Sequence, residues 1–172
     1  IGTGMLEQFG VLARGKPHGG EWHWFGEGHL GRSRHGAGSQ AGGPSSTGCV
    51  KTSQDVRNRF VSRLGDLQHE ELWVLPLRQS NHVLAEICIS RGRLTGTVVD
   101  PKLVFGRALA MRAAALVLVH NHPSGNPQPS EADRWLTSTL CEAGKHLDLP
   151  VLDHVIVAGK AFVSFADQGW LS

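Results

Sequence analysis

The chain is poor in the features that mark several large classes of protein. Its 172 residues include only three cysteines, carry a formal net charge of +2 and are 40% hydrophobic. Few, widely spaced cysteines do not suit a disulfide framework, and so small a charge does not indicate a phosphate-binding surface. No apolar run approaches the roughly 18 residues of a membrane span, and the amino end shows no secretory signal. We therefore expect one soluble, cytoplasmic domain with no membrane partner.

Glycine is abundant only towards the amino end. Of the 22 glycines, 14 lie in residues 1–48, among irregularly spaced histidines. No helical or strand period persists there beyond Met5 to Leu12, so residues 1–50 are predicted to form a Gly-rich, disordered arm without a specific metal site. Residues 51–172 show regular patterns and are predicted to fold as one domain.

The densest group of chemically active residues lies at 120–133, in the run His-Asn-His-Pro-Ser-Gly-Asn-Pro-Gln-Pro-Ser-Glu-Ala-Asp. Apolar residues 116–119 precede it and predict a buried strand that delivers His120 and His122 on one face. Beyond the Pro/Gly-rich turn, a helix start is predicted to return Asp133 towards the imidazoles. Three protein ligands leave a fourth position open for water, as in catalytic zinc sites.

Helix and strand patterns also precede this run. A helix is predicted with Ser53 as its cap and Gly65 at its end, followed by a hairpin of strands at 72–77 and 82–90. The second strand carries Glu86 between apolar neighbours. Glu86 is therefore a candidate for a carboxylate with a partly apolar environment.

The remaining segments complete a mixed pattern. A helix capped by Asp100 has apolar positions that continue through Met111 and Ala115. Another helix is predicted from 131 to 144, with Trp135 on its buried side. A closing hairpin is predicted from strands at 154–157 and 161–165. This order of elements predicts the α/β class in its broad sense.

Each part of the candidate site also has a simpler interpretation. Residues 130–133 form a capping box as readily as they supply a ligand, and the two roles are compatible. His120 and His122 fit ordinary polar residues at a strand end, and Glu86 fits a solvent-facing strand carboxylate. Only their conjunction favours a metal site.

Other candidates are weaker. Asp153-His154 could orient a metal ligand or simply form a structural hydrogen bond to the backbone, and the second role is favoured. Cys88 and Cys141 lack a CxxC partner and are predicted to be small core residues. The zinc-deaminase pattern of H-x-E followed by P-C-x-x-C is absent, which argues against a base-modifying enzyme.

Several segments together resemble RadC proteins (UPF0758-like), members of the JAMM or MPN-type metalloprotease superfamily. They are the run at 120–133, Glu86, Gly96-Thr97 and Leu152-Asp153-His154-Val155-Ile156-Val157. The resemblance covers about residues 54–171. It implies a curved mixed sheet flanked by helices and one zinc ion per chain.

Position by position, the resemblance implies roles for five residues. His120, His122 and Asp133 would be the zinc ligands. Glu86 would be the general base, and the hydroxyl of Ser130 would steady the oxyanion. Zinc lowers the pKa of water to about 7 and polarises a carbonyl placed beside it, so an amide bond is the substrate class that this arrangement suits.

Two classes of function follow. The first is a zinc-dependent hydrolase of peptide or isopeptide bonds, with a peptide or protein as substrate. The second is a DNA-repair-associated accessory protein in which zinc is structural or the activity vestigial. RadC proteins usually carry a helix-hairpin-helix-like segment before the JAMM domain, and residues 1–50 show nothing similar. Thirteen basic and twelve acidic side chains from residue 50 onward give little attraction for DNA, and the basic cluster is small, formed by Arg57, Arg59 and Arg63.

Overall fold

The computed structural model describes residues 48–92 and 99–171. The predicted arm therefore lies almost wholly outside the described residues, as does Gly96-Thr97. The elements follow the chain in the order α1 (Ser53–Leu64), β1 (Glu71–Leu77), β2 (Ile87–Arg91), α2 (Pro101–Ala110), β3 (Ala115–Asn121), α3 (Glu131–His146), β4 (Val151–Ala158) and β5 (Ala161–Ser164).

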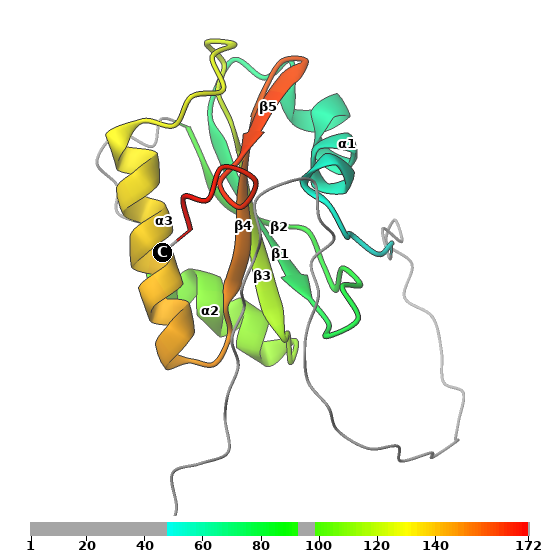
Figure 1. Cartoon of the computed structure of the whole chain (residues 1–172), viewed down its shortest axis with the longest axis vertical. Coiled ribbons are helices and arrows are strands. Elements are labelled where there is room, and N and C mark those ends of the chain that lie inside the picture. Colours follow the sequence, from blue (N-terminus) through cyan, green and yellow to red (C-terminus); the bar gives the residue numbers. More distant parts are fainter. Residues whose placement is uncertain (1–47, 93–98, 172) are drawn as a thin grey trace, which may run out of the picture.

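The strands form one mixed sheet in the order β2-β1-β3-β4-β5. β3 is central, pairing antiparallel with β1 on one side and parallel with β4 on the other. α1 lies on one face of this sheet, and α2 and α3 lie on the other (Figure 1). The predicted α/β class, with a mixed sheet flanked by helices, is confirmed.

A large hydrophobic core lies on each face of the sheet. The alternation of β3 sends Val117 and Val119 towards α1, where they meet Phe60. The intervening residues Leu116 and Leu118 point to the opposite face and pack with α2 and α3. This alternation decides on which face each later residue of β3 lies.

The start of α1 differs from the prediction by one residue. Thr52, not Ser53, is the N-cap, and its side chain and that of Asp55 form a reciprocal capping box. Ser53 is buried, and its hydroxyl donates to Asp167 at 2.5 Å. Two adjacent hydroxyl residues fit a cap equally well in sequence, and the tertiary contact with Asp167 decides between them.

The predicted strand at 82–90 is interrupted. His82 and Val83 form isolated bridges, residues 84–86 are irregular, and β2 begins only at Ile87. Pro76 of β1 accepts a hydrogen bond from the backbone N–H of Leu84, but a proline has no N–H to return. The ladder therefore breaks opposite Pro76, and Glu86 lies in the break.

Two predicted helix faces are also corrected. α2 ends at Ala110, and Arg112 has a φ of 54°, so Met111 and Ala115 do not continue the helix as predicted. Trp135 of α3 is 56% exposed rather than buried, although its neighbour Leu136 lies in the core as expected. Large apolar residues fit a helix stripe by spacing alone, whereas burial depends on what lies opposite.

No helix within the described segments combines the length and apolar character that a membrane crossing requires.

Candidate metal centre

The two histidines of the 120–133 run leave the end of the central strand on the same face. His120 follows Leu118 by two residues and so points to the side covered by α2 and α3. The backbone N–H of His122 donates to the carbonyl of Val157 at 2.8 Å, which extends the strand pairing beyond the end of β3. Both rings are therefore held by the sheet.

The carboxylate comes from the first turn of α3. Ser130 is the N-cap, and its hydroxyl accepts from the backbone N–H of Asp133 at 3.2 Å. In return the Oδ2 atom of Asp133 accepts from the backbone N–H of Ser130 at 2.7 Å and from its hydroxyl at 2.6 Å. The capping box considered from the sequence is thus present, and it fixes the direction of the Asp133 carboxylate.

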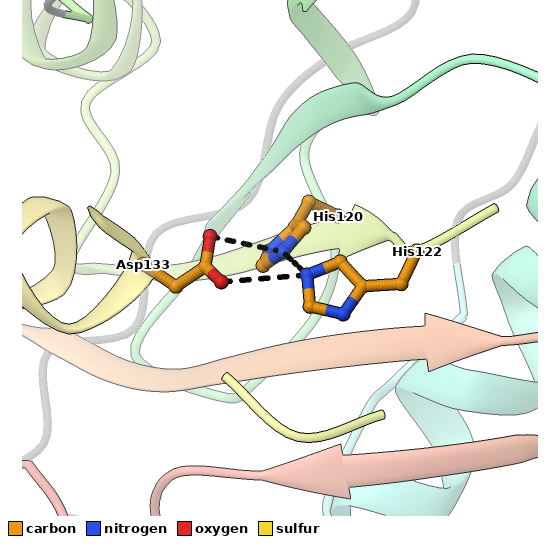
Figure 2. A group of neighbouring side chains, drawn as sticks. All are labelled: His120, His122 and Asp133. Atoms are coloured by element: carbon orange, nitrogen blue, oxygen red, sulfur yellow. Dashed lines mark hydrogen bonds and ion pairs between the residues drawn. The ribbon is translucent and has the colours of Figure 1, made fainter. Parts of the chain in front are cut away.

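These three side chains converge (Figure 2). The Nε2 atoms of His120 and His122 lie 2.8 Å apart. Asp133 faces both, with Oδ1 at 3.3 Å from Nε2 of His120 and Oδ2 at 3.4 Å from Nε2 of His122. One ligand atom from each residue lies within 4.8 Å of the others, a spacing at which all three could hold one ion.

The hydrogen bonds around the cluster fit a cation at its centre. Nδ1 of His122 is 2.8 Å from the backbone carbonyl of Asn126, which can only accept, so Nδ1 carries the proton. Nδ1 of His120 is likewise engaged with His154 on the side away from Asp133. The two Nε2 atoms and the carboxylate oxygens therefore face one another, and a metal ion is the group that such a donor set suits.

Burial and charge shift the ionisation of all three residues. Burial opposes the charge on Asp133, but the neighbouring imidazoles of His120 and His122 outweigh it and hold the pKa of Asp133 well below its usual range. Burial lowers the pKa of His120 despite the Asp133 carboxylate beside it. His122 is less enclosed, and there the hydrogen bond to Asp133 prevails over burial and raises the pKa of His122.

Glu86, the predicted general base, lies elsewhere. Its Oε1 is 2.9 Å from Nη1 of Arg59, and its Oε2 is 2.7 Å from Nη1 of Arg63. Both arginines belong to α1, so the Glu86 carboxylate lies on the α1 face, opposite the face that carries His120. Burial raises and the two guanidinium groups lower the pKa of Glu86, and the arginines prevail. The structure does not bring Glu86 to the histidines.

Another acid, which the sequence reasoning missed, does act on the histidines. The negative charge of Glu70 favours the protonated form of both His120 and His122, in the direction that raises the pKa of each. Leu72 of β1 pairs with His120, the last residue pair of this ladder, and the same register continued beyond it would bring Glu70 beside His122. Alternation with Leu72 could have put Glu70 on a shared face, but no sequence signal said which strand pairs with the histidines.

Asn121, between the two histidines, fixes the chain around Glu70. Its Nδ2 group donates to the backbone carbonyl of His69 at 2.9 Å, and its Oδ1 accepts from the backbone N–H of Glu71 at 2.8 Å. Asn121 is buried, so these bonds are shielded from water. The central residue of the His-Asn-His run therefore holds the residues on both sides of Glu70.

The contacts of the Asp153-His154 pair fit both of the roles considered from the sequence. The Oδ1 atom of Asp153 accepts from the backbone N–H of His154 at 2.7 Å and from that of Ala166 at 3.0 Å, which is a structural role. Nε2 of His154 lies 2.7 Å from Nδ1 of His120. The ring of His154 is thus directly behind a candidate ligand.

A mixed sheet with helices on both faces, and a His-x-His and Asp cluster where its central strand ends, is consistent with a JAB (JAMM or MPN-type) domain. The family model described as "RadC-like JAB domain" matches residues 50–170, and the chain belongs to this family. The resemblance seen in the sequence is confirmed.

Curated relatives bear the name UPF0758 protein. One from Leptothrix cholodnii is 47% identical over 118 residues, which cover 69% of this chain and 53% of the relative. One from Flavobacterium johnsoniae is 42% identical over 120 residues, covering 70% and 52%. YfjY of Escherichia coli K12 is 40% identical over 126 residues, covering 73% and 79%. The chain spans about half the length of the first two relatives, and these names state no activity.

Proposed function

We propose that this chain is a zinc-dependent hydrolase of peptide or isopeptide bonds. The observation that carries the proposal is the convergence of two imidazole Nε2 atoms and one carboxylate, each held by a rigid element. When bound, zinc would supply a water of lowered pKa and would polarise a substrate carbonyl. Three protein ligands leave an open position, as in catalytic rather than structural zinc sites.

His120, His122 and Asp133 would hold the ion. Two imidazoles and one carboxylate are a ligand set that zinc takes readily. The depressed pKa of Asp133 keeps its carboxylate ionised at neutral pH, as a ligand must be. His122 would have to lose its proton before binding, because its pKa is raised.

We assign the general base to Glu70 rather than to Glu86. Glu70 lies in the register position beside His122 and acts electrostatically on both rings, whereas Glu86 is held by two arginines on the other face of the sheet. In this role the Glu70 carboxylate would accept the proton of the attacking water and pass it to the leaving amine.

The predicted oxyanion role of Ser130 would require its hydroxyl to turn. A hydroxyl has one proton, and in the structure Ser130 donates it to Asp133 at 2.6 Å. Rotation about the Cβ–Oγ bond would redirect that proton towards a substrate oxygen. Until then the hydroxyl supports the Asp133 carboxylate.

The test combines metal analysis with hydrolysis. Wild-type protein is expected to hold one zinc ion per chain, and His122→Ala to hold none. On a panel of peptides and isopeptide-linked conjugates, zinc-loaded Glu70→Gln is expected to lose at least 100-fold in kcat while retaining zinc, because an amide cannot act as a base. Glu86→Gln is the matched control and is expected to keep its kcat. Wild-type protein that carries zinc yet cleaves nothing on the panel would contradict the proposal.

The DNA-associated alternative gains no support from the basic cluster of α1. Arg59 and Arg63 form ion pairs with Glu86, and Arg57 donates to the backbone carbonyl of Lys160 at 2.9 Å. Their charges therefore serve contacts within the domain. We do not propose DNA as a partner.

A further inference from the structure

A buried chain of hydrogen bonds runs from the candidate centre into the protein. Nδ1 of His120 lies 2.7 Å from Nε2 of His154. Nδ1 of His154 lies 2.6 Å from Oγ1 of Thr137, which lies 2.6 Å from the backbone carbonyl oxygen of Asp133. His120, His154 and Thr137 are all at most 2% exposed, so water does not compete for these bonds.

The donor and acceptor of each hydrogen bond in this series can be assigned by starting from the backbone carbonyl of Asp133. A carbonyl oxygen can only accept, so the single hydroxyl proton of Thr137 is donated to Asp133. The Thr137 oxygen must then accept, and the proton that it accepts belongs to Nδ1 of His154. A neutral imidazole carries one proton, so Nε2 of His154 has a lone pair.

The same reasoning assigns the ring proton of the candidate ligand His120. Because Nε2 of His154 accepts, Nδ1 of His120 donates, and Nε2 of His120 is left with its lone pair directed at Asp133 and His122. That is the tautomer in which His120 can bind a cation through Nε2. The ring of His154 is itself held in place by Phe165, which stacks on it with centroids 5.0 Å apart.

We propose that His154 and Thr137 are positioning residues that hold His120 in its metal-binding tautomer. The chain of bonds begins at the backbone of Asp133, whose side chain is a candidate ligand of the same ion. One turn of α3 thus supplies both a ligand and the anchor that prepares a second ligand from β3. The inference rests on the proposed metal site but not on the proposed reaction.

The decisive comparison is Thr137→Val with Thr137→Ser. Valine keeps the branched shape of threonine but removes the oxygen, whereas serine keeps the hydroxyl. Zinc affinity would be measured at fixed pH by competition with a chelator of known affinity. Thr137→Val is expected to bind zinc about 10- to 100-fold more weakly than wild-type protein, and Thr137→Ser within about 3-fold. Thermal unfolding of both metal-free variants would check that they fold alike.

A second measurement reads the proton directly. Ring ¹⁵N NMR of the metal-free protein is expected to show His120 protonated at Nδ1 in wild type and in Thr137→Ser, and a mixture of tautomers in Thr137→Val. His154→Phe, which keeps a ring but removes the acceptor, is expected to give the same mixture.

The outcomes separate this inference from the function proposed above. Unchanged zinc affinity and an unchanged His120 tautomer in Thr137→Val would overturn the positioning role even if the wild-type protein is a zinc hydrolase. A wild-type protein that binds no zinc would instead overturn the metal site, and the NMR spectrum would still decide whether Thr137 and His154 set the tautomer.

Discussion

The side chain of Asn121 accepts a hydrogen bond of 2.8 Å from the backbone N–H of Glu71, joining the end of the central strand to the start of β1. The same amide donates to the carbonyl of His69. Together these bonds bracket Glu70 and set its place relative to the neighbouring histidines.

Removing this amide is expected to destabilise the domain. Asn121→Ala leaves a buried N–H and a carbonyl without partners, and the expected loss in the free energy of unfolding is about 2–3 kcal/mol. Urea denaturation of the metal-free protein measures it. Gln128→Ala, at an exposed position in the following turn, is the control and is expected to change stability by less than about 0.5 kcal/mol. Equal stability of the two variants would show that the two hydrogen bonds of the Asn121 side chain contribute little to the free energy of unfolding.

Ser130→Ala separates capping from catalysis. Loss of the N-cap is expected to lower the free energy of unfolding by about 1 kcal/mol. If the hydroxyl also turns to an oxyanion, kcat at saturating zinc is expected to fall on the order of 100-fold. Ser130→Thr keeps a hydroxyl and a cap, and it is expected to retain most of both properties. A Ser130→Ala enzyme with undiminished kcat would limit the residue to its structural role.

Glu86 is expected to contribute to stability in a way that depends on pH. Glu86→Gln removes the ion pairs with Arg59 and Arg63 and is expected to cost about 1–2 kcal/mol at pH 7, a modest value because Arg63 is partly exposed. The pKa of Glu86 is lowered in the folded state from its ordinary 4.5, so its contribution is present at neutral pH and is lost as pH falls through the folded value.

Denaturation at several pH values would test this dependence. The difference between wild type and Glu86→Gln is expected to shrink below pH 4.5. Glu142→Gln, on the exposed face of α3, is expected to show a difference below about 0.5 kcal/mol throughout. A gap between wild type and Glu86→Gln that persists in acid would point to packing rather than charge.

Asp153 is expected to change the free energy of unfolding with pH in the opposite direction to Glu86. Burial raises the pKa of Asp153 to about 6 from an ordinary 3.8, despite the hydrogen bonds that it accepts. Between these values the folded protein binds more protons than the unfolded chain, so this residue makes the domain more stable as pH falls from 7 towards 4. The full effect is on the order of 3 kcal/mol at most. Other groups also change the stability as pH changes, so wild type must be compared with Asp153→Asn. The free energy of unfolding would be measured against pH for both proteins. The rise in stability between pH 7 and pH 4 that is due to Asp153 is expected in wild type and not in Asp153→Asn.

The grouping of His120, His122 and Asp133 could be predicted because it is local. Alternation along one strand places the two imidazoles together, and a capping signal fixes where the following helix begins. Both rules operate within fourteen residues of the chain. No knowledge of distant strand pairing is needed to bring these side chains near one another.

The choice of the glutamate proposed as general base could not be made from local sequence patterns. Glu86 and Glu70 both lie near apolar strand residues, and they are distinguished by tertiary contacts: the register of β1 against β3 for Glu70 and the ion pairs with α1 for Glu86. That register joins segments about fifty residues apart, and its continuation beyond Leu72 would bring Glu70 to the histidines. Pro76 adds a second effect, since it breaks the pairing that would have kept Glu86 within a regular strand. The exposure of Trp135 has the same origin, because helix spacing does not reveal which face is covered.

Asp133 is both part of a helix cap and a proposed metal ligand, which has a consequence for the metal-free protein. Its carboxylate is oriented by the start of α3 and the imidazoles by the sheet, through backbone bonds that need no ion. Small zinc-dependent folds collapse when stripped of metal, whereas here the vacated ligands would stay in place. With the proposed zinc site, a cell short of zinc would keep a folded reserve of this protein that could take up the ion without refolding.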